Sequence, residues 1–262
     1  MKGRCWIPLL ALAWIVGLSG CSKSPSGPAF GTMSVKMTDA PADYEAVNLL
    51  VVQVAAHRAG DDSTSGWEVL ESDTVTYDLL SLQNGVFATL ATSQVPAGHY
   101  TQLRLKLAPG CNVVIGGVPH PLTVPSGLQS GLKLIGSIDV PANGRMDLAL
   151  DFDAARSIEE TGSGSFILNP TVRMLPSSAA GAIRGIVAPA GMPTMVYALQ
   201  AADTLGTAMT APDGSFALSV LPAGTYDLAL HPAVEFPDSR VSGIVVVAGT
   251  TTDVGVLQLG AP

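Results

Sequence analysis

The chain alternates apolar and polar residues in many short runs, and this period of two is typical of β-strands that bury one face. Val, Leu and Ile dominate the runs, and turn pairs such as Pro109-Gly110 and Asn143-Gly144 separate them. Before residue 154 the runs are MSVKMTD, AVNLLVVQVAAH, WEVLES, VTYDLL, YTQLRLKLA, CNVVIGG, PHPLTV, LKLIGSIDV and RMDLALDFD. We predict a strand at each of them, and a short helix within DAARSIEETG (153–162).

The pattern resumes after residue 181, in GAIRGIVA, TMVYALQAA, LGTAMTAPDGSFALSVLPAGTYDLALHPA and SGIVVVAGTTTDVGVLQL. Between the two series lies PSSAAG (176–181), a stretch of small residues that is typical of a linker between domains. We therefore predict an all-β protein with two β-sandwich domains in tandem, at residues 31–176 and 181–262.

The phrase Pro-Ala-Gly-x-Tyr occurs once in each predicted domain, at residues 96–100 and 222–226. In each copy the proline favours a turn, and the glycine supplies a backbone conformation that other residues resist. The tyrosine then begins a strand, where its ring can join the core while its hydroxyl reaches the backbone. The copies share no nucleophile or acid pair, so we interpret the repeat as architecture and not as a repeated active site.

Residues 1–20 have the features of a cleaved export signal. Two basic residues precede a mostly apolar run, Trp6 to Val16, that is too short to cross a bilayer comfortably. The run leads to Leu18-Ser19-Gly20-Cys21, which resembles the lipobox of bacterial lipoproteins. The resemblance implies cleavage before Cys21, attachment of acyl chains there, and a protein held on the membrane by this lipid.

Residues 21–30 contain Ser, Pro and Gly without periodicity, and we predict a flexible tether there. By resemblance to lipoprotein sorting, Ser22 favours the outer membrane of the bacterial cell envelope. The alternative is a secreted protein that carries an incidental cysteine at its signal junction.

The sequence holds 13 basic and 21 acidic residues, and loss of Lys2 and Arg4 with the signal leaves a formal charge of −10. Nucleic acids need a basic footprint, so we predict no nucleic-acid partner. Once Cys21 is lipidated, Cys111 has no partner for an intramolecular disulfide, and we expect it to be buried and unreactive.

Two family resemblances cover most of the chain. Residues 31–175 resemble domain of unknown function 4382, common in bacterial lipoproteins, through VKMTDAP (35–41), AVNLLVVQVAAHR (46–58), VPAGHYTQLRL (95–105), VPSGLQSGLKL (124–134) and LDFDAARSI to TVRML (150–175). Residues 181–260 resemble the carboxypeptidase regulatory-like domains through VYALQAADTLGTAMTAPDGSFALSVLPAGTYDLAL (196–230). The first resemblance implies an exported sandwich without an established activity. The second implies a transthyretin-like sandwich, often grouped with carbohydrate-binding-like folds, that serves as a spacer or stabilising appendage.

Few residues are spaced for catalysis. Ser130 and Lys133 match S-x-x-K, but the supporting S-D-N and K-T-G motifs of penicillin-recognising enzymes are missing, so we expect a turn with Lys133 directed outward or paired with an acid. The four histidines lack ligand or triad spacing, and we predict no metal site, no cofactor and no catalytic residues. Trp67 is expected in the core and not on a sugar-binding surface.

The densest acidic cluster comprises Asp151, Asp153, Glu159 and Glu160. Alternation along a strand places Asp151 and Asp153 on one face, where a weak calcium site is conceivable. Pairing with Arg156 or helix capping would equally account for these acids, and a glycosidase-like acid pair is formally possible.

The function that we predict is that of a non-catalytic binding, structural or adhesion-type accessory protein, anchored through lipid on Cys21, with an unknown protein or glycan partner. A ligand surface would then include Ser130, Lys133, Asp151, Asp153 and Arg156. The alternatives are a carbohydrate-binding module protein, which would need exposed coplanar aromatic rings, and a cell-envelope hydrolase with an acidic site.

Overall fold

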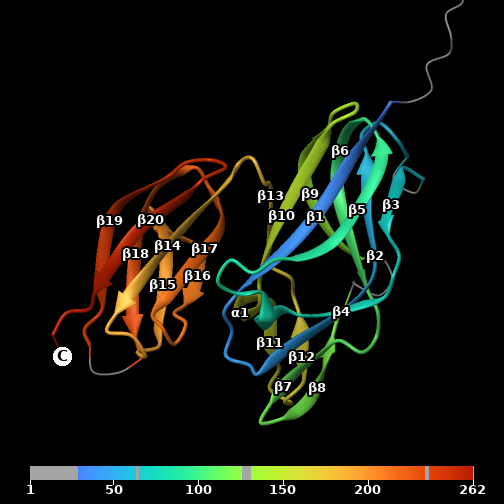
Figure 1. Cartoon of the computed structure of the whole chain (residues 1–262). Helices are drawn as coiled ribbons and strands as arrows, with labels where there is room; N and C mark the ends of the chain where they lie inside the picture. The colour runs from blue at the N-terminus through green and yellow to red at the C-terminus, as the bar shows by residue number, and fades with distance from the viewer. Residues whose placement is uncertain (1–28, 63–64, 126–130, 234–235, 262) are drawn as a thin grey trace, which may run out of the picture.

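The protein is built almost wholly of β-strands, which confirms the predicted all-β class (Figure 1). The structure is a computed structural model that describes residues 29–62, 65–125, 131–233 and 236–261. Within these ranges the helical segments are one turn of 3-10 helix, η1 (Leu79–Leu82), and one α-helical turn, α1 (Ala154–Ser157). The strands form four sheets, two in each half of the chain.

The first half of the chain folds into a four-stranded and a nine-stranded sheet. The smaller sheet has the order β13 (Val172–Pro176), β10 (Arg145–Asp153), β1 (Phe30–Ala40) and β5 (Ala88–Pro96), and within it β1 and β10 are parallel. The larger has the order β11 (Ile158–Glu160), β12 (Phe166–Leu168), β8 (Val118–Thr123), β7 (Asn112–Ile115), β2 (Ala46–Arg58), β6 (Gly98–Leu107) and β9 (Leu132–Val140). Two further strands pair with β2, β3 (Trp67–Glu71) and β4 (Val75–Asp78).

Alternate residues of these strands point between the two sheets and form one hydrophobic core, because successive side chains on a strand face opposite sides. The most deeply buried of them include Met33, Val35, Met37, Leu103, Leu105, Leu148, Leu150 and Phe152. The intervening residues face outward, and those on β10 and β6 carry the polar groups of the candidate sites described below.

The second half of the chain has a core of its own, which includes Ile183, Val196, Phe216 and Leu228. Its smaller sheet has the order β17 (Ser215–Pro222), β14 (Ala180–Ala188) and β20 (Thr251–Gln258). Its larger sheet has the order β16 (Asp203–Met209), β15 (Thr194–Gln200), β18 (Gly224–Pro232) and β19 (Ser239–Val246). Figure 1 shows the two halves side by side, with the short connection from β13 into β14 passing between them.

Both Pro-Ala-Gly-x-Tyr phrases lie at corners where the chain leaves one sheet of a sandwich and enters the other, from β5 to β6 and from β17 to β18. The hydroxyl groups of Tyr100 and Tyr226 donate to the carbonyl oxygen of the proline four residues earlier, at 2.8 Å in both cases. Both rings are fully buried, so the predicted architectural role of the tyrosines is confirmed.

The two glycines of these phrases serve different needs. Gly98 has φ +148°, a conformation that L-residues resist, as predicted. Gly224 is not among the glycines with positive φ; instead, a Cβ atom there would lie 2.3 Å from Nε2 of Gln200. The prediction of an unusual backbone conformation is therefore wrong for Gly224, where an added side chain would displace only the end of the flexible Gln200 side chain.

Several elements differ from the prediction. β5, with the sequence ATLATSQVP, is a strand that its small and polar residues did not indicate, and β11, β12 and β13 lie beyond the last run predicted before residue 181. The helix predicted within 153–162 is only one turn, because β11 begins at Ile158. The run VTYDLL leaves the strand conformation at Leu79, where Asp78 caps η1 by accepting from the amide of Leu80.

Candidate functional site

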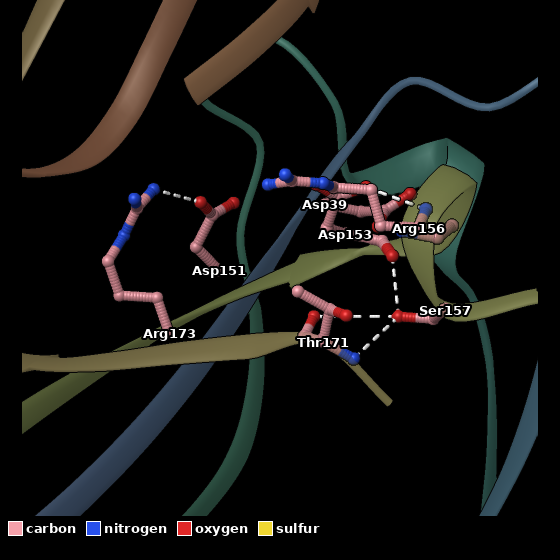
Figure 2. Close-up of polar contacts among 8 residues, drawn as sticks. Asp39, Asp151, Asp153, Arg156, Ser157, Thr171 and Arg173 are labelled. Carbon is pink, nitrogen blue, oxygen red and sulfur yellow. Dashed lines mark hydrogen bonds and ion pairs between the residues drawn. The ribbon is translucent and has the colours of Figure 1, made fainter. Parts of the chain in front are cut away.

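Charged side chains gather on the part of the four-stranded sheet that faces the second half of the chain, where β1, β10, β13 and α1 meet (Figure 2). We call the following residues the junction cluster: Asp39, Asp151, Asp153, Arg156 and Arg173. Asp151 and Asp153 lie on the same face of β10, as alternation predicts, with Phe152 buried between them on the core side.

Asp151 and Arg173 form the most buried ion pair of the cluster. They stand directly opposite each other on β10 and β13, and Nη2 of Arg173 donates to Oδ2 of Asp151. Their side chains are 15% and 23% exposed. Burial raises the pKa of Asp151 to about 6, although the guanidinium of Arg173 acts to lower it. Removing either partner would leave a charge with little access to water.

Asp153 organises the short helix α1. Its Oδ1 accepts from the amide of Arg156 at 3.0 Å, and the Arg156 Nε lies 3.9 Å from its Oδ2. The hydroxyl of Ser157 donates to the Asp153 carbonyl oxygen at 2.5 Å and accepts from the amide of Thr171 at 2.8 Å (Figure 2). Asp153 and Arg156 are thus engaged in capping and pairing, two of the roles that the sequence left open.

Asp39, which sequence reasoning missed, stands opposite Phe152 in the register of β1 and β10, so it lies on the core-facing side of the sheet, at the end where α1 begins. Its residue is 5% exposed, its Oδ1 accepts from the amide of Ala154 at 3.0 Å, and its Oδ2 is buried without a hydrogen-bond partner among the described residues. The pKa of Asp39 is raised to about 8, chiefly by burial and also by the carboxylates of Asp151 and Asp153, although the hydrogen bond from the amide of Ala154 acts to lower it. Asp39 is therefore a neutral carboxylic acid at neutral pH.

Residues of β16 complete the surroundings of the junction cluster. Asp151, Asp153, Arg156 and Arg173 line one side of a small cavity of about 60 Å³, and residues 204–207 line the other.

On a neighbouring part of the junction, Nδ2 of Asn84 donates to the carbonyl oxygen of Met209 at 2.9 Å, and its Oδ1 accepts from the amide of Ala217 at 3.4 Å. Asn84 thus binds the backbone of the second half through both ends of its amide.

Three of the four acids in the predicted acidic cluster, Asp151, Asp153 and Glu159, contact protein groups. Glu159 accepts from Nδ2 of Asn169 at 3.0 Å, in addition to the contacts of Asp151 and Asp153 described above. Within the described ranges, no group of three or more His, Cys, Asp or Glu side chains is placed to hold a metal ion.

The structure does not bring together all the residues of the predicted ligand surface. Asp151, Asp153 and Arg156 belong to the junction cluster, whereas Lys133 is exposed on β9, in the other sheet of the sandwich. Because Leu134 points into the core, Lys133 faces outward from the nine-stranded sheet, on the side away from the junction cluster. Ser130 lies outside the described residues, as do Cys21 and nearly all of the predicted tether.

The prediction that Trp67 lies in the core is wrong, because its ring lies on the outer face of the nine-stranded sheet, where cations surround it. The Arg104 Cζ is 3.9 Å from the Trp67 ring centroid and the Lys133 Nζ is 5.9 Å away. The ring of His57 meets it edge-on at 5.0 Å between centroids. The sequence signal was the alternation itself, which places Trp67 opposite to the buried Leu70.

Cys111 is buried, as expected, and 3% exposed. Its Sγ accepts from the amide of Leu50 at 3.3 Å, and burial raises the pKa of its thiol. Burial and the raised pKa both make the thiol a poor nucleophile, although the hydrogen bond from Leu50 acts to lower the pKa. None of the helices in the described part of the chain is long and apolar enough to cross a membrane.

A family model described as "Domain of unknown function (DUF4382)" matches residues 30–170. No curated protein matches the chain in sequence. Among solved structures, the chain is similar to a type II cohesin–X-dockerin complex from Acetivibrio cellulolyticus, with 14% identity and TM-score 0.26, over 31% of this chain and 58% of that one. It is similar to the Bacillus anthracis TIE protein, with 10% identity and TM-score 0.26, over 88% of this chain and 34% of that one. It is also similar to GBS52, the minor pilin of Streptococcus agalactiae, with 11% identity and TM-score 0.23, over 88% of this chain and 96% of that one.

Proposed function

The chain belongs to the DUF4382 family, and from its own residues we propose that it is an exported, lipid-anchored accessory protein with a non-catalytic binding or adhesion-type role. Acyl chains on Cys21 hold it at the bacterial cell envelope, in the outer membrane. The first sandwich meets a protein or glycan partner, and the second, a transthyretin-like appendage, braces the first.

The observation that carries this proposal is the way in which the polar groups at the junction are used. Asp151 is paired with Arg173, Asp153 caps α1, and Asn84 binds the backbone of the second sandwich at two points. A general acid or base must reach a substrate proton. The two carboxyl groups whose pKa is raised are instead enclosed and engaged: Asp151 is paired with Arg173 at the junction, and Asp39 is buried against the amide of Ala154.

The test combines anchoring and capture. The native chain and a Cys21→Ala version are expressed at equal levels in intact cells, and both membrane association and co-captured proteins or glycans are measured. Cys111→Ala is the matched control, because it removes a thiol that is buried and not in the proposed anchor. We expect Cys21→Ala alone to lose membrane association and its specific partner. Membrane association that survives Cys21→Ala would contradict the anchor, and capture of nothing by the native chain would contradict the accessory role.

A further inference from the structure

The outer face of the nine-stranded sheet carries a group of cations that have no acidic partner within the part of the chain that the structure describes. It is formed by β3, β2, β6 and β9, and we call its polar and aromatic residues the basic face: Gln53, Trp67, Gln102, Arg104, Lys106 and Lys133. Leu103, Leu105 and Leu107 are buried in the core, so Gln102, Arg104 and Lys106 all point to the other side of β6.

The pairing of charges elsewhere makes this face unusual. Ten lysines and arginines are described, and five of them lie within 4.0 Å of an aspartate: Arg145, Arg156, Arg173, Arg184 and Arg240. Among the described residues, no such ion pair involves Arg104, Lys106 or Lys133. Half of the described lysines and arginines are thus in ion pairs, whereas three cations without such a pair among the described residues lie together on a single face of one sheet.

Two of these cations are direct neighbours. Arg104 and Lys133 stand opposite each other in the register of β6 and β9, and like charges in that position destabilise a sheet. The stacking of Arg104 on Trp67 fixes the guanidinium, and its Nε is buried without a hydrogen-bond partner among the described residues. A bound anion would relieve the repulsion and use the cations in the positions where Trp67 already holds them.

We propose that the basic face binds an acidic polysaccharide, whose carboxylate or sulfate groups contact Arg104, Lys106 and Lys133. Gln53 and Gln102 flank the cations, and their amides can bond to sugar hydroxyl groups. A single polymer chain can lie along this strip, whereas an anionic membrane would also meet the surrounding surface of a chain that is acidic overall. Ile135, 86% exposed beside Gln102, offers an apolar contact for the face of a sugar ring.

This inference deepens the proposed function by naming the partner's chemistry, and it is tested with the full chain in a non-ionic detergent. The probes are oligogalacturonate as a carboxylated chain, heparin oligosaccharide as a sulfated chain, cellohexaose as a neutral chain, and phosphatidylglycerol vesicles. Titration calorimetry at low and high salt measures binding. We expect an acidic oligosaccharide to bind, more weakly as salt rises, and cellohexaose to remain unbound.

Two sets of variants test whether binding requires the lysines of the basic face or positive charge anywhere on the chain. Lys106→Gln together with Lys133→Gln should weaken binding at least about tenfold, because each lost charge-assisted contact is a substantial part of the affinity. Lys36→Gln, which removes a cation that lies over Phe87 in the other sheet, should leave binding unchanged. Equal binding by the double variant, no binding of either acidic oligosaccharide, or binding of the vesicles alone would each overturn the inference. If the double variant still captures the native partner in cells, the accessory role stands and this face is not its site.

Discussion

The buried carboxyl group of Asp39 should make the stability of the protein fall as pH rises through neutrality. The folded state holds its proton up to a pKa of about 8, while the unfolded chain releases it near the ordinary value of 3.8. Between these pH values the folded state binds one more proton than the unfolded state. Each unit of increase in pH therefore lowers the free energy of unfolding by about 1.4 kcal/mol. Above the folded pKa both states are ionised and the contribution stops changing.

The neighbouring Asp151 limits the pH range over which the effect of Asp39 on the free energy of unfolding can be measured separately. Its pKa, raised to about 6, gives a slope of the same sign at lower pH, and above that value it is ionised in both states. From about pH 6 to about pH 8 we therefore expect Asp39 to contribute a loss of about 2–3 kcal/mol.

Asp39→Asn is the test, because an asparagine keeps an oxygen for the amide of Ala154 and has no proton to lose. Urea unfolding at a series of pH values, followed by circular dichroism, gives the free energy of unfolding of each variant. Ionisable groups that the substitution does not touch contribute equally to both proteins and cancel in the difference between them. The exposed Asp73→Asn serves as the control and should follow the native curve. Parallel curves for Asp39→Asn and the native chain would refute the reasoning.

Three further predictions concern the joint, the corners and the buried thiol. Asn84→Ala removes two hydrogen bonds between the sandwiches, so calorimetry should show weaker coupling of their unfolding, by about 1–3 kcal/mol; an unchanged transition would show that Asn84 does not join them. Tyr100→Phe and Tyr226→Phe should each cost about 1 kcal/mol in urea unfolding, since both remove the same bond, and a loss in only one sandwich would contradict an equivalent role. Cys111 should react with a thiol reagent only after denaturation; rapid reaction of the native chain would mean that it is accessible.

The alternation of residues was sufficient to predict the fold class, because a half-buried strand must place every second side chain in the core. It correctly placed Asp151 and Asp153 together, since they are two positions apart on one strand. It failed for β5, because its buried residues, Leu90, Ala91 and Val95, do not fall at regular alternate positions and polar residues lie between them. A strand of this kind is stabilised by its neighbour β1 more than by its own composition.

The candidate sites could not be derived in the same way, because they depend on which strands become neighbours. Asp39 meets the acids of β10 only because β1 and β10 pair in parallel, across more than a hundred residues of sequence. Lys133 was grouped with those acids in the prediction, yet the two belong to opposite sheets, and no local pattern reports which sheet a strand joins.

The two charged regions also show why a count of acids and bases says little about where an acidic protein can bind. In the junction cluster, Asp151 and Asp153 have arginines beside them and the carboxyl of Asp39 retains its proton, so few unbalanced charges remain at the joint. On the basic face the described residues supply no acidic partner for Arg104, Lys106 or Lys133, and Trp67 fixes Arg104 in place. Opposite charges that are already paired produce little net electrostatic potential and so attract a ligand weakly. Cations that are fixed and have no ion-pair partner attract an anionic ligand even on a chain with a net negative charge. The basic face, where Arg104, Lys106 and Lys133 form no ion pair with the described residues, is therefore the surface from which recognition is expected.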